Sequence, residues 1–170
     1  YTDYEDIDGD GVLDTTFKPS FKYYGYFDEA KCYVYDDLSS RFDPDSMAIQ
    51  TMDGRYTCTE SKSLWSGNFL NWASMSRVDV IRKMLYGGKR STDEVPSKIG
   101  SMTTTVLERA NLSQDAHSFV KHYWGTDIRD YTPFTTMALT KITGSNAGMY
   151  AGLTLCSRSD VMGEQGNPVI

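Results

Sequence analysis

The chain has 170 residues and a formal net charge of −6, with 39% hydrophobic and 24% charged residues. This composition excludes a disordered tail, and no run approaches the roughly 20 apolar residues that a membrane-spanning helix needs. The length fits one module over residues 1–170, and the acidic excess speaks against a nucleic-acid partner, because such binding requires clustered Lys and Arg.

The first residues, Tyr1–Asp6, contain neither a basic start nor an apolar stretch, so we expect that they do not form a signal peptide. We therefore expect either that a leader has been removed or that the chain is a piece of a longer one. Secretion is compatible with both.

Residues 5–17 form an acidic loop, in which Asp6–Asp14 has the spacing D-x-D-x-D-G-x-x-D. Calcium takes six to eight oxygen ligands, and carboxylates at alternating positions of a tight turn supply them. The sequence therefore predicts a structural calcium (Ca2+) site. Its expected ligands are four carboxylates and one backbone carbonyl: Asp6, Asp8, Asp10, Val12 and Asp14. The alternative is a solvated acidic turn, in which the four aspartates would repel one another.

The predicted loop differs from an EF-hand at its twelfth place, which is Phe17 instead of a bidentate glutamate. A further ligand must come from another residue, and the candidates are Glu5, Asp28 and Glu29. The residues after Asp14 are also poor helix formers. We therefore expect a stand-alone calcium loop that stiffens the N-terminal region, not a paired sensor.

Twelve tyrosines are a high number for this length, and many of them lie early in the chain. Residues 21–35 are aromatic and β-branched, and they predict two strands joined by a polar turn at Asp28-Glu29. Tyrosine combines a large apolar ring with a polar tip, which suits half-buried strands and interfaces. The interpretations are aromatic ladders on these strands or a contact surface for a partner or ligand.

None of the three cysteines stands in a C-x-x-C pattern or near a histidine at zinc spacing, which excludes thiolate metal sites and covalent haem. Residues 36–64 are turn-rich and mostly loop, with a short strand at 55–58. We predict a disulfide between Cys32 and Cys58, which closes a loop of about 27 residues and contributes roughly 3 kcal/mol. Cys156 either pairs outside the fragment or is buried as a small hydrophobe.

The clearest helix spans residues 66–86, with Ser66 as its N-cap, an i, i+3, i+4 apolar pattern and Gly87-Gly88 as a left-handed exit. Beyond it, residues 104–112 favour a strand. Residues 113–132 have no clear pattern, and a short helix over 116–123 is compatible with them.

Together these elements predict an α+β fold. Tyr-rich antiparallel strands pack on one long amphipathic helix, in a loop-rich single module with an N-terminal calcium loop and a disulfide-closed loop. Its parts are the calcium loop at 5–17, strands and the disulfide loop at 21–64, the helix at 66–86, and strands and loops at 104–170.

Catalytic patterns are weak. His117 lies beside Asp115 and Ser118, but neighbours in sequence rarely build a triad. No nucleophile-elbow, zinc-protease or phosphate-loop motif occurs. We expect no enzymatic activity, and the alternative from another class is a hydrolase that uses His117 and a carboxylate.

A long and unusual string, W-S-G-N-F-L-N-W-A-S-M-S-R-V-D-V, occupies residues 65–80 and is followed by R-K-M-L-Y-G-G-K-R at 82–90. It accompanies D-G-D-G-V-L-D at 8–14 and Y-Y-G-Y-F-D at 23–28. In these strings the chain resembles the PilY/PilC family, the large tip-associated adhesin and assembly factors of bacterial type IV pili.

Members of that family are many times longer, so the resemblance implies an N-terminal-region fragment, a processed product or a short paralogue. It implies a non-enzymatic part of a type IV pilus tip (fimbrium), at the extracellular face of the bacterial cell surface, that acts in cell adhesion and pilus biogenesis. The implied partners are pilin or minor pilin subunits, or the remainder of a larger pilus-tip protein. The alternative is a self-assembling subunit of an extracellular filament or surface coat.

Overall fold

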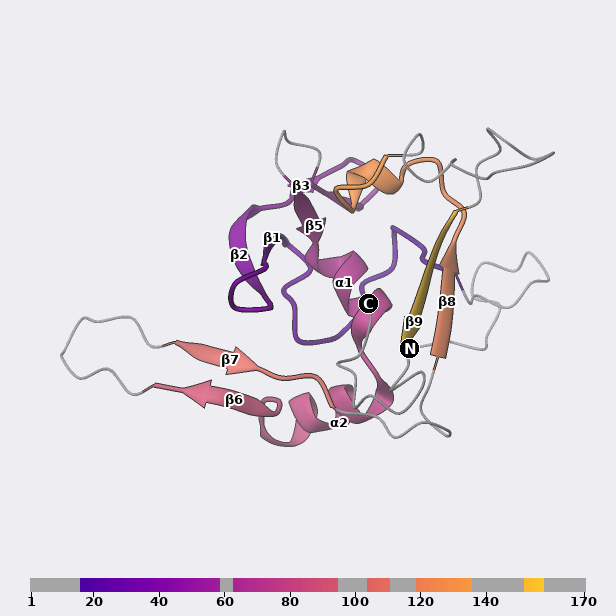
Figure 1. Ribbon diagram of the computed structural model, residues 1–170. Helices are drawn as coiled ribbons and strands as arrows, with labels where there is room; N and C mark the ends of the chain where they lie inside the picture. The colour runs from indigo at the N-terminus through magenta and orange to yellow at the C-terminus, as the bar shows by residue number, and fades with distance from the viewer. Residues whose placement is uncertain (1–15, 59–62, 95–103, 111–118, 136–151, 158–170) are drawn as a thin grey trace.

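The computed structural model describes residues 16–58, 63–94, 104–110, 119–135 and 152–157 (Figure 1). Its elements in chain order are β1 (Lys31–Asp36), β2 (Arg41–Met47), β3 (Ile49–Gln50), β4 (Tyr56–Thr57), β5 (Leu64–Ser66), α1 (Gly67–Ser74), α2 (Arg77–Tyr86), β6 (Arg90–Asp93), β7 (Thr105–Leu107), β8 (Phe119–Tyr123), η1 (Ile128–Asp130) and β9 (Leu153–Ser157).

All strand pairs of the described part are antiparallel. A three-stranded sheet has the order β2-β1-β5, and the other pairs are β3-β4, β6-β7 and β8-β9. In Figure 1, α1 lies between the three-stranded sheet and the β8-β9 pair, whereas α2 and the β6-β7 hairpin extend away from this centre. The predicted α+β class is therefore confirmed.

The single helix predicted over 66–86 is wrong, because the structure divides it into α1 and α2. The Ser76 hydroxyl accepts a hydrogen bond from the Asp79 N–H, and the Asp79 carboxylate accepts one from the Ser76 N–H, both at 3.2 Å. This capping box satisfies donors that a helix start leaves open, so it favours a new helix at this point. The predicted ends are confirmed, with Ser66 as N-cap and Gly87 in the left-handed region.

In the described part of the chain, no helix has the length and apolar character that crossing a membrane requires.

The predicted strands differ from the observed ones mainly before Lys31. Two strands were expected over 21–35, but regular strand begins only with β1, and residues 16–30 contain none. The stretch 36–64, expected to be mostly loop, contributes β2, β3 and β5 besides the predicted short strand. The short helix admitted over 116–123 is also wrong, because Phe119–Tyr123 forms β8 by pairing with the distant β9.

The tyrosine-rich segment before β1 is held by two side chains of α1 and not by a neighbouring strand. Asn68 accepts from the Tyr23 N–H at 2.9 Å and donates to the Phe21 carbonyl at 2.7 Å. Asn71 accepts from the Phe27 N–H at 3.0 Å and donates to the carbonyls of Tyr23 and Phe27, both at 2.9 Å. We name this pair the asparagine clasp. It gives partners to backbone groups that would otherwise need a strand ladder.

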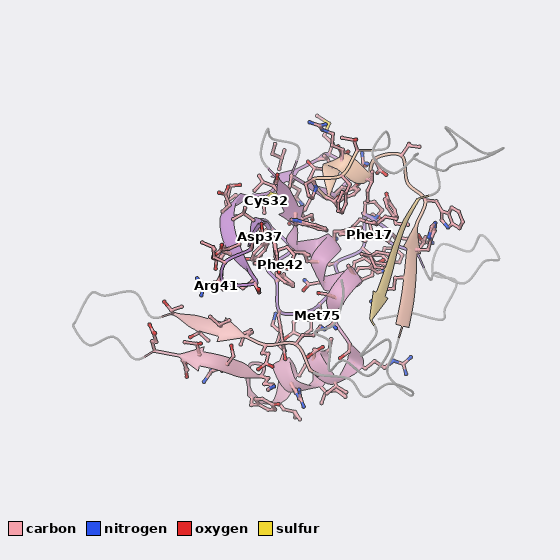
Figure 2. All side chains as sticks on the ribbon, in the orientation of Figure 1. Phe17, Cys32, Asp37, Arg41, Phe42 and Met75 are labelled. Atoms are coloured by element: carbon pink, nitrogen blue, oxygen red, sulfur yellow. A yellow bond between two sulfur atoms is a disulfide. The ribbon has the colours of Figure 1, made fainter. Side chains whose placement is uncertain are left out.

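The larger hydrophobic core of the described residues lies between α1 and the β8-β9 pair, and it is rich in aromatic rings. Phe17 is only 2% exposed, and its ring centroid lies 5.0 Å from that of Phe69 and 5.1 Å from that of Tyr131. Figure 2 shows Phe17 directed into this space. Such edge-to-face pairs add about 0.5–1.5 kcal/mol each beyond their burial. The buried members are Phe17, Phe69, Trp72, Ala73, Tyr123, Ile128, Tyr131, Leu153 and Leu155.

The C-terminal end of α1 is satisfied by two cations from distant parts of the chain. Lys121 in β8 donates from its ammonium group to the Trp72 carbonyl, and Arg109 donates to the Ser74 carbonyl at 3.3 Å. Positive charge at this end also complements the helix dipole. Burial lowers the pKa of Lys121 from 10.5 to about 8, and burial likewise lowers the pKa of Arg109.

Replacing Asn71 by leucine, a residue of similar volume, removes three hydrogen bonds and leaves the Phe27 N–H and two carbonyls without these partners. An unsatisfied buried polar group costs about 1–3 kcal/mol, so we expect the free energy of unfolding to fall by about 3 kcal/mol. Urea denaturation followed by tryptophan fluorescence measures this change. The control is Gln50→Leu at an exposed amide, with an expected effect of about 0.5 kcal/mol or less. A loss below about 1 kcal/mol for Asn71→Leu would contradict the role of the clasp.

The buried Lys121 makes stability depend on pH. Between its folded pKa of about 8 and its ordinary value of 10.5, the unfolded chain holds more protons on this group than the folded one. The free energy of unfolding therefore rises with pH through this window and is lowest, for this group, where the buried amine is charged.

The matched variant is Lys121→Met, which keeps an apolar stem and lacks the amine. The stability of the wild type relative to this variant should rise by about 3 kcal/mol as the pH increases through that window. Guanidinium denaturation of both proteins over a pH series measures the difference, in which the other titrating groups cancel. A difference that stays constant with pH would refute the assignment.

Candidate functional site

Residues 5–15 of the predicted calcium loop lie outside the described residues, with all its expected ligands: Asp6, Asp8, Asp10, Val12 and Asp14. The structure does describe the last two residues of the loop. The Thr16 hydroxyl donates to the His122 carbonyl at 3.1 Å, and the next residue, Phe17, is buried in the aromatic core. The twelfth place of the pattern is therefore a core residue and not an oxygen ligand, so an EF-hand arrangement does not fit.

Two candidates for a further calcium ligand are described, and both lie beside cations. The Asp28 carboxylate is 3.6 Å from the Lys31 ammonium, and the Glu29 carboxylate is 4.0 Å from the Lys22 ammonium. Glu5 lies outside the described residues. Within the described ranges, no group of three or more His, Cys, Asp or Glu side chains could hold a metal ion.

The structure joins Cys32 and Cys58 by a disulfide, the pair that the sequence analysis predicted, with 5.9 Å between the Cα atoms. Cys32 lies in β1 (labelled in Figure 2) and Cys58 follows β4, so the bond ties the three-stranded sheet to the β3-β4 hairpin. The Cys58 N–H also donates to the Asp130 carbonyl at 2.7 Å, which fastens η1 to the same point. Cys156 lies in β9, opposite Val120 of β8.

A network of charged and tyrosine side chains connects the β3-β4 hairpin to η1. The Arg55 guanidinium lies 3.5 Å from the Asp127 carboxylate and donates to the Tyr131 hydroxyl at 3.4 Å. The Tyr131 hydroxyl donates to Asp127 at 3.1 Å, and the Tyr123 hydroxyl donates to the same carboxylate. Burial, together with the negative charge of Asp127, raises the pKa of Tyr131. These side chains satisfy one another's hydrogen-bonding groups, so the network fastens the β3-β4 hairpin to the segment around η1.

A hollow of about 320 Å³ opens over the segment that the asparagine clasp holds, and we name it the tyrosine hollow. It combines aromatic rings with one ammonium and two carboxylate groups. Its lining residues are Tyr23, Tyr24, Gly25, Tyr26, Phe27, Asp28, Glu29, Tyr33 and Lys83.

Close backbone approach at Gly25 and one lysine of α2 shape one side of the hollow. A Cβ at residue 25 would lie 2.2 Å from Asn71 Oδ1 and 2.4 Å from Met75 Cγ, so only glycine lets the segment reach the clasp. The Lys83 ammonium donates to the Gly25 carbonyl and lies 4.5 Å from the centroid of the Tyr24 ring. This lysine therefore links α2 to the segment and also lines the hollow.

The opposite side of the hollow is formed by the turn that enters β1. The Tyr33 hydroxyl accepts a hydrogen bond from the Asp28 N–H at 2.8 Å, and its ring meets that of Phe27 edge-on, with centroids 5.0 Å apart. Burial raises the pKa of Tyr33. Both sides are thus held by hydrogen bonds to fixed elements.

Sequence reasoning singled out the early tyrosines, and four of them, Tyr23, Tyr24, Tyr26 and Tyr33, line the hollow. The two interpretations, strand ladders or a contact surface, both stay predictions. The role of Lys83 was missed, because its position in the sequence shows only a cation in the C-terminal half of a helix. The residues of the alternative hydrolase, His117, Asp115 and Ser118, lie outside the described residues.

Comparisons with known proteins agree with the resemblance in the sequence. The profile of a family described as PilY1 homolog, small alpha/beta domain, matches residues 14–168. Two proteins of Xylella fastidiosa, both named type IV pilus biogenesis factor PilY1 homolog, are similar to the chain. One is 38% identical over 141 residues, or 79% of this chain, and the other is 36% identical over 106 residues, or 60% of it.

The matched regions amount to 9% and 8% of those two proteins, so the chain spans about a tenth of the length of these relatives. No solved structure matches the chain.

Proposed function

This chain belongs to the PilY1-homolog family, as its small alpha/beta domain, and from this membership we propose that it serves type IV pilus biogenesis as a non-enzymatic domain at the bacterial cell surface. The observation that carries the proposal is the family match over residues 14–168, nearly the whole chain. The two similar Xylella fastidiosa proteins carry the same role in their names.

A structural role is supported by how the buried polar side chains are used. Asn68 and Asn71 bind backbone groups of the tyrosine-rich segment. Asp79 binds the start of α2 and the Ala110 N–H, the latter at 2.7 Å. Each of these groups is occupied in holding the fold, which is the expected use of buried polar groups in a scaffold.

An extracellular location is supported by the disulfide between Cys32 and Cys58, because such bonds form and persist in oxidising compartments. We infer that the domain is secreted and remains at the cell surface with the pilus, where it contributes to adhesion.

The exposed face of α2 supports binding to a partner protein. Ile81 is 54% exposed, Met84 72% and Leu85 76%, and they recur at helical spacing. An apolar stripe of this kind favours burial against another protein surface. The partners that fit the proposed role are pilin or minor pilin subunits, or other parts of a larger pilus-tip protein.

Calcium binding is a further part of the proposal, and it rests on the spacing of Asp6–Asp14. The structure adds that Phe17, three residues after Asp14, is fixed in the aromatic core. A cation that orders the loop would therefore act on a segment tied directly to that core.

In the bacterium that encodes the chain, the chromosomal change Asn71→Leu tests the pilus role. We expect a several-fold loss of surface pili, because a destabilised domain lowers the abundance of its protein. Immunoblots of sheared pilin against total pilin measure the loss, and Gln50→Leu serves as the control. Unchanged surface pili in cells that have lost the protein carrying this domain would refute the role.

Isothermal titration with calcium tests the metal site. Binding should release or absorb measurable heat, and calcium at 100 times its dissociation constant should raise the free energy of unfolding by about 2.7 kcal/mol. The variant with Asp8→Asn and Asp10→Asn should bind at least about tenfold more weakly, because it lacks two carboxylates. Asp37→Asn, at an exposed carboxylate outside the loop, is the matched control. No heat and no stabilisation by millimolar calcium would rule the site out.

A further inference from the structure

We propose that the tyrosine hollow is a binding site for an uncharged saccharide and that it holds a single sugar ring. This goes beyond the proposed role in pilus biogenesis and stands without it. All its lining residues are described, and they come from the clasped segment, from β1 and from α2.

The hollow is built before any ligand arrives. The clasp holds the segment through five hydrogen bonds from Asn68 and Asn71, and the Lys83 ammonium holds the Gly25 carbonyl. A site fixed in this way loses little conformational entropy on binding.

Two of the tyrosine hydroxyls that line the hollow are already engaged with the backbone. The hydroxyls of Tyr26 and Tyr33 already accept hydrogen bonds from the backbone N–H groups of Lys89, at 3.2 Å, and Asp28, at 2.8 Å. Tyr24 is 47% exposed, so the part of its ring that the Lys83 ammonium does not cover is accessible. An apolar ring face suits a ligand with a face of C–H groups.

The charges around the hollow give no net attraction to an ion of either sign. The Asp28 carboxylate lies 3.6 Å from the Lys31 ammonium and the Glu29 carboxylate lies 4.0 Å from the Lys22 ammonium, so both are already paired. The Lys83 ammonium is likewise engaged by a carbonyl of the clasped segment. A neutral ligand needs no net charge attraction, and its hydroxyls can use the ammonium donor and the carboxylate acceptors.

Saccharide rings have the matching chemistry, because their hydroxyls both donate and accept hydrogen bonds and their ring carbons carry a face of C–H groups. The volume of about 320 Å³ is near the lower end for ligand sites, which admits one small ring. For a neutral ligand of this size we expect a dissociation constant on the order of 1 mM.

The test uses the folded 170-residue chain, labelled with 15N, and follows amide shifts while sugars are added. The probes are neutral methyl glycosides of glucose, galactose and mannose, with glucosamine as a cationic and glucuronate as an anionic comparison. At least one neutral glycoside should shift amides of residues 23–29 saturably, and the two charged sugars should bind at least about fivefold more weakly.

Two variants assign the binding to the hollow. Tyr24→Ala should weaken it by about fivefold to tenfold, which corresponds to loss of one aromatic contact, and Glu29→Gln should weaken it through loss of a charged acceptor. The matched control is Tyr35→Ala, because Tyr35 is 42% exposed and lies outside the hollow. Retained amide dispersion shows that each variant is folded.

Three outcomes would overturn the proposal: no saturable shift at residues 23–29 with any neutral glycoside up to about 50 mM, preferred binding of the cationic or anionic sugar, or unchanged affinity in both hollow variants. The readout is binding by the isolated chain, so a failed pilus experiment and a failed sugar titration remain distinguishable.

Discussion

The asparagine clasp is the interaction on which the arrangement of this domain depends. Two amide side chains, on one face of a helix of eight residues, replace the ladder that a neighbouring strand would supply. Asn68 and Asn71 are three positions apart, so both amides point to the same side of α1. Because each amide both donates and accepts, two side chains satisfy five backbone contacts. The segment can then cross the helix closely, and the tyrosine hollow is the space that this crossing leaves.

The helix that carries the clasp is too short to be stable by itself, since isolated helices below about 12–15 residues are marginal in water. Tertiary contacts supply what its length does not. Its residues are all buried, and Lys121 and Arg109 satisfy carbonyls at its C-terminal end. Burial disfavours the charged form of the Lys121 side chain and therefore lowers its pKa. A buried cation is tolerated here because it meets the end of the helix dipole and an open carbonyl.

The sequence predicted those features that depend on local residue patterns or on the positions of the cysteines. The α+β class, the ends of the helical region and the pairing of Cys32 with Cys58 belong to this group. The sequence at Ser76 contains S-x-x-D, the spacing of a capping box, but the apolar spacing continues across it and predicts one long helix. The clasp could not be predicted, because Asn68 and Asn71 look like ordinary polar positions until the partner segment is placed beside them. The same holds for Lys121, whose burial depends on β9, more than thirty residues further along the chain.

The position of Phe17 decides how the N-terminal loop can influence the rest of the domain. A ligand raises the free energy of unfolding only when its site is lost together with the fold. A loop joined to the domain by a flexible stretch would bind and release calcium without affecting stability. Here only Thr15 and Thr16 separate Asp14 from Phe17, a ring 2% exposed at the centre of the aromatic core. The core cannot open around Phe17 without moving the end of the loop. Calcium held by those aspartates would therefore oppose the opening of the core, and the same cation would strengthen the support of the helix that carries the clasp.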